Sequence, residues 1–191
     1  MAYIKPVVAL IEWFGPYSLE GAKEATSEFD YEDGLYIVIG KLNGQRASQI
    51  QYVGLASNLR SRLSGNHHAI HKVTKDQKLW LGEIISPRTP GRKIKVTDRM
   101  LDLAEWAHAY FLQLPLNLKK KSKPPDRPIV VYNKWWRTDF ETPHKRRPHV
   151  QWPDIIDYNG SEYAAKLVWF GGSQMVQDVS FFTPKALSAA D

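Results

Sequence analysis

The stretch GLYIVIGKLNGQRASQIQYVG, residues 34–54, determines the fold that the sequence predicts. Its first seven residues are glycine, β-branched, aliphatic or aromatic, which is typical of a strand. Asn43-Gly44 is a hairpin turn signal, and residues 49–54 predict the returning strand. Because the connection is short, we expect the two strands to pair antiparallel.

Helix and strand signals continue after this hairpin. Ser57 or Asn58 can cap a short helix that ends at Gly65. Residues 78–85 predict a third strand. The clearest helix covers residues 98–114, because its apolar side chains recur with a period near 3.6 and Pro115 stops it.

Five short motifs follow one another along these elements. They are Gly34-Leu35-Tyr36, Tyr52-Val53-Gly54, Arg62 on the short helix, Glu105 on the long helix and Asn117 after it. Their order, element types and spacings strongly resemble the GIY-YIG nuclease family over roughly residues 33–118. Each motif is weak alone, but the ordered set is specific.

The resemblance implies an α+β fold, with a small, mostly antiparallel three-stranded sheet packed against helices and extended at both ends. Residues 1–32 would form an N-terminal strand-helix extension, and residues 33–118 the nuclease core. Residues 119–191 would form a basic, Trp-containing C-terminal extension.

The resemblance also implies a metal-dependent endonuclease that hydrolyses phosphodiester bonds in DNA, in restriction, repair or the movement of mobile elements. Such hydrolysis needs an activated water and charge stabilisation at phosphorus. By similarity, Glu105 would hold Mg²⁺ or Mn²⁺, Arg62 would bind phosphate, and Tyr36 or Tyr52 would lie near the nucleophile. Asn117 would steady the site or the phosphate. A tyrosine base would need its pKa lowered from about 10 by Arg62 or the metal.

The sequence departs from the family pattern at two places. Many members carry a lysine or another polar residue after the second motif, where this chain has Leu55. Many restriction-type members carry a histidine four residues beyond the arginine, where this chain has Asn66. We expect His67, or else His68 or His71, to assist as a general base; the alternative is that all three are loop residues near DNA.

Other site chemistries fit the sequence less well. His67 and His71 lie four apart, and His108 follows Glu105 by three, which raises a zinc site as an alternative. A second Glu-x-x-His pair is missing from the sequence, as is the nucleophile elbow of a serine hydrolase. Taken singly, each nuclease residue also has an ordinary structural interpretation, as a packed tyrosine, a solvated charge or a turn asparagine.

A basic charge balance favours a polyanionic partner. The chain has a formal charge of +6, and residues 118–150 carry ten Lys or Arg against three acids, with Trp135 and Trp136 among them. Basic residues interleaved with aromatic ones suit nucleic acid. The alternative is a solvated linker anchored by buried tryptophans. The residues expected to bind nucleic acid are Arg60, Lys119, Lys120, Lys121, Lys123, Lys145, Arg146 and Arg147.

Composition narrows the setting further. The chain has no cysteine, which fits a reducing cytoplasm, and no stretch approaches the roughly 20 apolar residues of a membrane helix. We expect a cytoplasmic protein with DNA as partner, RNA as an option and no membrane, acting as a monomer or a transient homodimer on its substrate. The competing functions are a non-cleaving nucleic-acid-binding module with the same core, an RNA-cutting toxin nuclease and a structural interaction protein.

Overall fold

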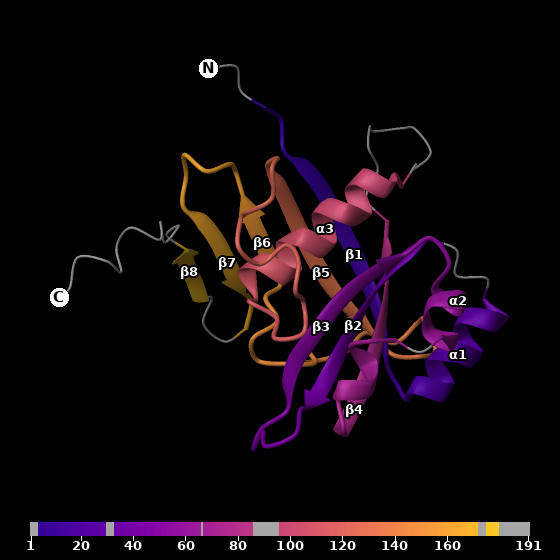
Figure 1. Cartoon of the computed structure of the whole chain (residues 1–191). Helices are drawn as coiled ribbons and strands as arrows, with labels where there is room; N and C mark the ends of the chain where they lie inside the picture. The colour runs from indigo at the N-terminus through magenta and orange to yellow at the C-terminus, as the bar shows by residue number, and fades with distance from the viewer. Residues whose placement is uncertain (1–3, 30–32, 66, 86–95, 172–174, 180–191) are drawn as a thin grey trace.

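The computed structural model of the chain describes residues 4–29, 33–65, 67–85 and 96–171, and the backbone of 175–179 (Figure 1). Its helices are α1 (Leu19–Glu28), α2 (Leu59–Ser64) and α3 (Asp98–Phe111), with a 3-10 turn, η1, at Ile70–Lys72. Its strands are β1 (Val7–Tyr17), β2 (Gly34–Lys41), β3 (Gln49–Ala56), β4 (Lys75–Ile84), β5 (Ile129–Trp136), β6 (Ile155–Tyr158), β7 (Ala165–Trp169) and β8 (Met175–Val179).

All the described strands join one mixed sheet in the order β3-β2-β4-β1-β5-β6-β7-β8. The prediction of a small three-stranded sheet packed with helices is therefore wrong. The predicted hairpin and third strand do form, but they make up one end of a much larger sheet. The reason is β1, which pairs antiparallel with β4 and parallel with β5 and so joins the hairpin to the C-terminal strands.

The three sequence segments share this sheet. Residues 1–32 contribute β1 and α1, residues 33–118 contribute β2, β3 and β4, and residues 119–191 contribute the last four strands. Helix α3 contacts β3, β2, β1, β5 and β6, because the sheet curls around it (Figure 1). The long C-terminal segment is thus a continuation of the sheet.

The antiparallel hairpin that the sequence predicts forms between β2 and β3. Tyr36 lies opposite Gly54, and Val38 opposite Tyr52. At the turn, Gly44 has a φ of 83°, in the left-handed region that glycine tolerates. Beside the turn, the Gln51 amide donates to the Gly40 carbonyl at 2.7 Å, which fixes the base of the connecting loop.

Alternation along the strands gives the sheet two different faces. Leu35, Ile37 and Ile39 belong to the apolar cluster around α3. Tyr36 and Val38 belong to a second cluster, which is completed by α1 and α2. The sheet therefore separates α3 from α1 and α2, and this separation decides which polar side chains can meet.

Trp13 fixes the junction between the two halves of the sheet. Its side chain is fully buried, and its ring lies against the backbone of Gly82 on β4. Its Nε1 donates to the Asn133 side chain on β5 at 2.8 Å. Asn133 also donates to the Pro153 carbonyl at 3.0 Å, so one tryptophan connects three segments that are distant in sequence.

No helix in the described part of the chain has both the length and the apolar composition needed to cross a membrane.

The contact between Trp13 and Gly82 gives a stability prediction. A Cβ at position 82 would lie 2.5 Å from Trp13 Cζ3, so Gly82→Ala must displace a ring that has no room to move. We expect a loss of about 1–3 kcal/mol in the free energy of unfolding, measured by urea denaturation. Gly65→Ala is the control, because a Cβ at position 65 would come no closer than 3.8 Å to its nearest non-adjacent atom, the Ser61 carbonyl oxygen. Equal stabilities of the two variants would contradict this packing.

Candidate active site

Four of the six predicted catalytic residues meet on the sheet face that carries α1 and α2. The Tyr36 hydroxyl oxygen lies 2.6 Å from His67 Nε2, and Arg62 Nε donates to the same oxygen at 3.3 Å. The Tyr52 ring lies 5.8 Å from the Tyr36 ring and 5.3 Å from the His67 ring, between centroids. Residues from β2, β3, α2 and the segment after α2 thus form one cluster.

Local sequence explains how this cluster is positioned. Gly54 leaves space for the Tyr36 ring, because a Cβ at position 54 would overlap it. The Asn58 side chain caps α2 by accepting from the Ser61 amide at 2.7 Å. Leu59 and Leu63 bury the inner face of α2, which leaves Arg62 on its flank, above Tyr36.

The hydrogen bonds of His67 determine where its proton lies. The backbone N–H groups of Ala69 and Ile70 both donate to Nδ1, at 3.1 and 3.2 Å. Nδ1 is therefore an acceptor, and the proton of the neutral ring must be on Nε2. His67 then donates to Tyr36, as Arg62 does. This arrangement argues against His67 as a base toward Tyr36.

The two buried polar groups of the cluster are uncharged at neutral pH. Burial lowers the pKa of His67 to about 4, and the positive charge of Arg62 acts in the same direction. Burial also raises the pKa of the Tyr36 hydroxyl, with Tyr52 adding to the effect and Arg62 opposing it. Tyr36 is fully buried, so its hydroxyl positions Arg62 without itself facing solvent.

Arg62 and His67 line a pocket of about 490 Å³ beside α2. Arg62 is exposed there, and within the described residues no carboxylate forms an ion pair with it. Uncompensated guanidinium groups bind phosphate well, because their planar fork matches its oxygens. The other lining residues are Leu55, Ala56, Ser57, Asn58, Ser61 and Gly65.

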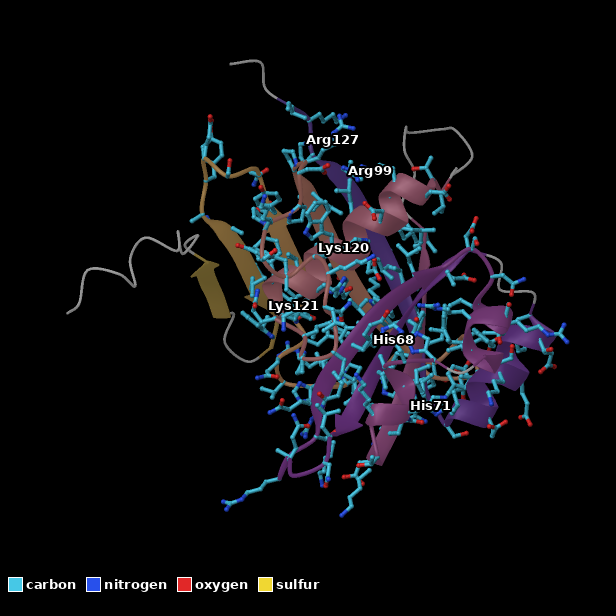
Figure 2. All side chains as sticks on the ribbon, viewed as in Figure 1. His68, His71, Arg99, Lys120, Lys121 and Arg127 are labelled. Carbon is cyan, nitrogen blue, oxygen red and sulfur yellow. The ribbon has the colours of Figure 1, made fainter. Side chains whose placement is uncertain are left out.

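The remaining histidines of this region lie at its edge. The exposed His68 ring stacks on His67 at 4.8 Å between centroids, and the exposed His71 belongs to η1. In the view of Figure 2, both lie on the α2 side, whereas Lys120 and Lys121 lie beside α3. Asn66, which stands at the family's histidine position, is outside the described residues.

Asn117 is buried and bonds to the backbone of β3. Its side-chain oxygen accepts from the Val53 N–H at 3.0 Å, and its side-chain nitrogen donates to the Val53 carbonyl at 2.8 Å. The Leu116 N–H donates to the Gln51 carbonyl at 2.9 Å beside it. Asn117 thus holds the backbone of β3 next to Tyr52, and it supports the site indirectly, through this strand.

Glu105 lies apart from the cluster. It forms an ion pair with Lys120, whose ammonium also binds Asp102 at 2.6 Å. Helix α3 packs on the opposite face of the sheet from Tyr36 and Tyr52. Within the described residues, no hydrogen bond or ion pair connects Glu105 to the cluster.

The expected metal does not fit Glu105 as it is placed. The Lys120 ammonium occupies the position between the Asp102 and Glu105 carboxylates where a cation would bind. The described part of the chain contains no group of three potential metal ligands. His108, the other candidate for zinc, is fully buried and bonded to the Ala104 carbonyl at 2.8 Å.

The residues predicted to bind nucleic acid separate into three regions. Lys119, Lys121 and Lys123 lie on a loop that is tied to α3, since Trp106 Nε1 donates to the Lys123 carbonyl at 2.9 Å. Lys145, Arg146 and Arg147 lie instead against β5. Arg60 is exposed on α2, near the Arg62 pocket.

The sequence reading did not single out the face of β5 that these basic residues cover. Tyr132, Lys134 and Trp136 alternate along the strand and line a second, larger cleft. The signal was present as the spacing Y-x-K-x-W, which puts an aromatic, a cationic and another aromatic side chain on one strand face.

Comparison of the chain with protein families, with curated proteins and with solved structures finds no match. The geometry of the molecule must therefore support any assignment of function.

The two hydrogen bonds of the Asn117 side chain to Val53 give a prediction for stability. Asn117→Ala leaves the buried N–H and carbonyl of Val53 without partners. We expect the free energy of unfolding to fall by about 1–3 kcal/mol, measured by urea denaturation. Asn117→Asp keeps the acceptor but loses the donor, so it should lose stability too. An unchanged midpoint in both variants would show that these bonds do not hold β3.

The His67 assignment can be tested by NMR of the imidazole nitrogens. We expect the proton on Nε2 at pH 7 and titration near pH 4, far below the ordinary pKa of 6.5. Because the unfolded chain binds this proton more readily, the His67 contribution to stability is lost as pH falls from about 6.5 to 4. Arg62→Gln should move the pKa of His67 upward. A proton on Nδ1, or titration near pH 6.5, would refute the assignment.

Proposed function

We propose that this chain is an endonuclease of the GIY-YIG type that hydrolyses phosphodiester bonds in DNA, with the phosphate bound in the Arg62 pocket. One observation supports the proposal above the others. The Arg62 guanidinium is exposed, forms no ion pair with any carboxylate that the structure describes, and donates through Nε to the buried Tyr36 hydroxyl. A cation fixed in one orientation at a pocket suits a phosphate whose negative charge grows in the transition state.

Within this proposal the four residues have separate roles. Arg62 binds the nonbridging oxygens of the phosphate through its terminal nitrogens. Tyr36 is a positioning residue. Its hydroxyl oxygen accepts hydrogen bonds from both Arg62 and His67 and so fixes the positions of these two side chains relative to each other. His67 remains neutral, which leaves Arg62 as the positive charge of this cluster at neutral pH.

Dependence on Mg²⁺ or Mn²⁺ remains part of the proposal, because the motif order resembles a metal-dependent family. We derive no catalytic step from a metal, since Lys120 pairs with Glu105 as it is placed. The proposed setting is the cytoplasm, in keeping with a chain that lacks cysteine. A single pocket that cuts both strands of a duplex would favour a transient homodimer on the substrate.

The ion pair between Glu105 and Lys120 favours one alternative, a nucleic-acid-binding module that does not cut. Lys120 neutralises the carboxylate that was expected to bind the metal. A module that binds nucleic acid without cutting it needs no metal, so this ion pair would not impair its function. An RNA-cutting toxin would use the same pocket and differs only in its substrate. All three functions are separated by offering DNA and RNA to the same protein.

The deciding experiment measures cleavage of plasmid, single-stranded DNA and RNA, with Mg²⁺, with Mn²⁺ and with a chelator. We expect the parent protein to cut DNA, and Arg62→Ala to lose about 100- to 1000-fold in kcat, as when one transition-state donor is removed. Arg62→Lys keeps the positive charge but loses the hydrogen bond from Nε to Tyr36, so it should restore only part of the kcat that Arg62→Ala loses. Tyr36→Phe should lower kcat with little change in KM.

Two matched controls complete this assay. Arg60→Ala removes a neighbouring exposed arginine from the same helix and should change KM more than kcat. Glu105→Ala should abolish metal-dependent cutting but spare binding if Glu105 is a metal ligand, whereas parental cutting by this variant would exclude that role. A protein that binds DNA but cuts no substrate under any condition would favour the binding module.

A further inference from the structure

A second cleft, of about 980 Å³, lies over β5 on the far side of β1 from the Arg62 pocket. Its floor consists of Tyr132, Lys134 and Trp136, which alternate on one strand and therefore share a face. The Lys134 ammonium lies 5.9 Å from the centroid of the Tyr132 ring. The floor thus combines two aromatic side chains with one positive charge.

The chain after β5 folds back to build one wall of this cleft. Trp136 forms a β-bridge with Pro143, and the His144 N–H donates to the Trp135 carbonyl at 2.9 Å. The turn between them is held by Asp139, which accepts from the Thr142 N–H at 2.8 Å. These bonds hold the following basic residues, Lys145, Arg146 and Arg147, beside the floor.

A buried carboxylate anchors the opposite wall. Asp154 accepts from Arg147 at 2.8 Å and from the Phe170 N–H at 2.7 Å. Arg147 also donates to the Phe170 carbonyl. The Phe170 side chain is 42% exposed, and its ring lies 6.4 Å from the Tyr132 ring. Two hydrogen bonds therefore hold the backbone of Phe170, whose ring is exposed at the rim.

The cleft carries more positive charge than its own residues neutralise. Asp154 is the acidic lining residue, and it is already paired with Arg147. Lys134, Lys145 and Arg146 are exposed and have no ion-pair partner within the described residues. Three buried donors of the lining residues, Trp135 Nε1, Trp136 Nε1 and Arg147 Nε, lack an acceptor within the described residues. These features suit a ligand that carries negative charge, hydrogen-bond acceptors and planar rings.

We propose that this cleft binds unpaired nucleotides of a nucleic-acid strand. Phe170 and the floor aromatics stack on the bases, and Lys134, Lys145 and Arg146 contact the phosphates. Stacking requires bases that are free of a duplex, because paired bases present only their edges in the grooves. The cleft is thus a single-strand site, separate from the pocket that holds Arg62.

The register of the sheet relates the two sites. Tyr36 on β2, Leu81 on β4, Phe14 on β1 and Trp136 on β5 lie in one row and point to the same face. Three strand spacings separate Tyr36 from Trp136, or roughly 14 Å along the sheet. The choice of a polynucleotide as ligand rests on the proposed function, and it predicts that cutting is directed to DNA with an unpaired stretch near the scissile bond.

The test measures binding of fluorescein-labelled oligothymidylate, oligouridylate and a DNA hairpin of equal length by anisotropy, with the full chain in chelator. We expect oligothymidylate to bind more tightly than the hairpin, with the oligouridylate arm showing whether the sugar matters. Phe170→Ala should raise the Kd for oligothymidylate roughly five- to a hundredfold, the range expected for loss of one stacked base. Lys145→Ala/Arg146→Ala should weaken binding at least tenfold and flatten its salt dependence.

A charge-matched control is Lys72→Ala/Lys75→Ala, which removes two exposed lysines outside the cleft lining. Parental binding by Phe170→Ala would overturn the proposal, as would equal losses in the two double variants or a preference for the hairpin. Failure of the nuclease function appears elsewhere, as unchanged cleavage in Arg62→Ala. Each hypothesis can therefore fail while the other stands.

Discussion

The position of β1 between β4 and β5 is the constraint on which the rest of the structure depends. Without this strand the hairpin of β2 and β3 would end at β4, and the C-terminal strands would have no partner on that side. Trp13 stabilises this arrangement. Its ring packs against the backbone of Gly82, where no side chain intervenes, and its Nε1 donates to the side-chain oxygen of Asn133. Pairing over such sequence distances is costly in chain entropy, so it must be repaid by deep burial and a satisfied hydrogen bond at this point.

Local features of the molecule could be predicted from sequence, and long-range ones could not. The hairpin within residues 34–56, the cap of α2 and the start of α3 follow from turn residues, capping side chains and apolar periodicity, although α3 ends at Phe111, three residues before its predicted end. The parallel pairing of β1 with β5 leaves no such mark, because nothing in residues 7–14 specifies a partner more than a hundred positions away. The same holds for the site: Tyr36, Tyr52 and Arg62 converge through neighbouring elements, whereas Glu105 depends on how the sheet curls around α3.

The two faces of the sheet explain this division of the polar residues. A side chain on β2 or β3 reaches one face or the other according to its position in the alternation, and a shift of one residue would exchange them. The tyrosines fall on the face of α2, where Arg62 meets them. Glu105 lies on α3, which the curved sheet surrounds, and there it forms an ion pair with Lys120. Among the residues expected to bind nucleic acid, Lys120 pairs with the acids of α3, whereas Lys145 and Arg146 are exposed and have no ion-pair partner within the described residues.

The amide of Asn117 has a consequence for how molecules of this protein meet one another. β3 is one of the two edge strands of the described sheet, and edge strands offer unpaired donors and acceptors to any extended peptide. A primary amide presents one donor and one acceptor side by side, as a neighbouring strand would, and here it occupies the places that an incoming chain would take at Val53. Asn117 thus covers the backbone groups at Val53 through which another extended chain could pair with the edge of this sheet.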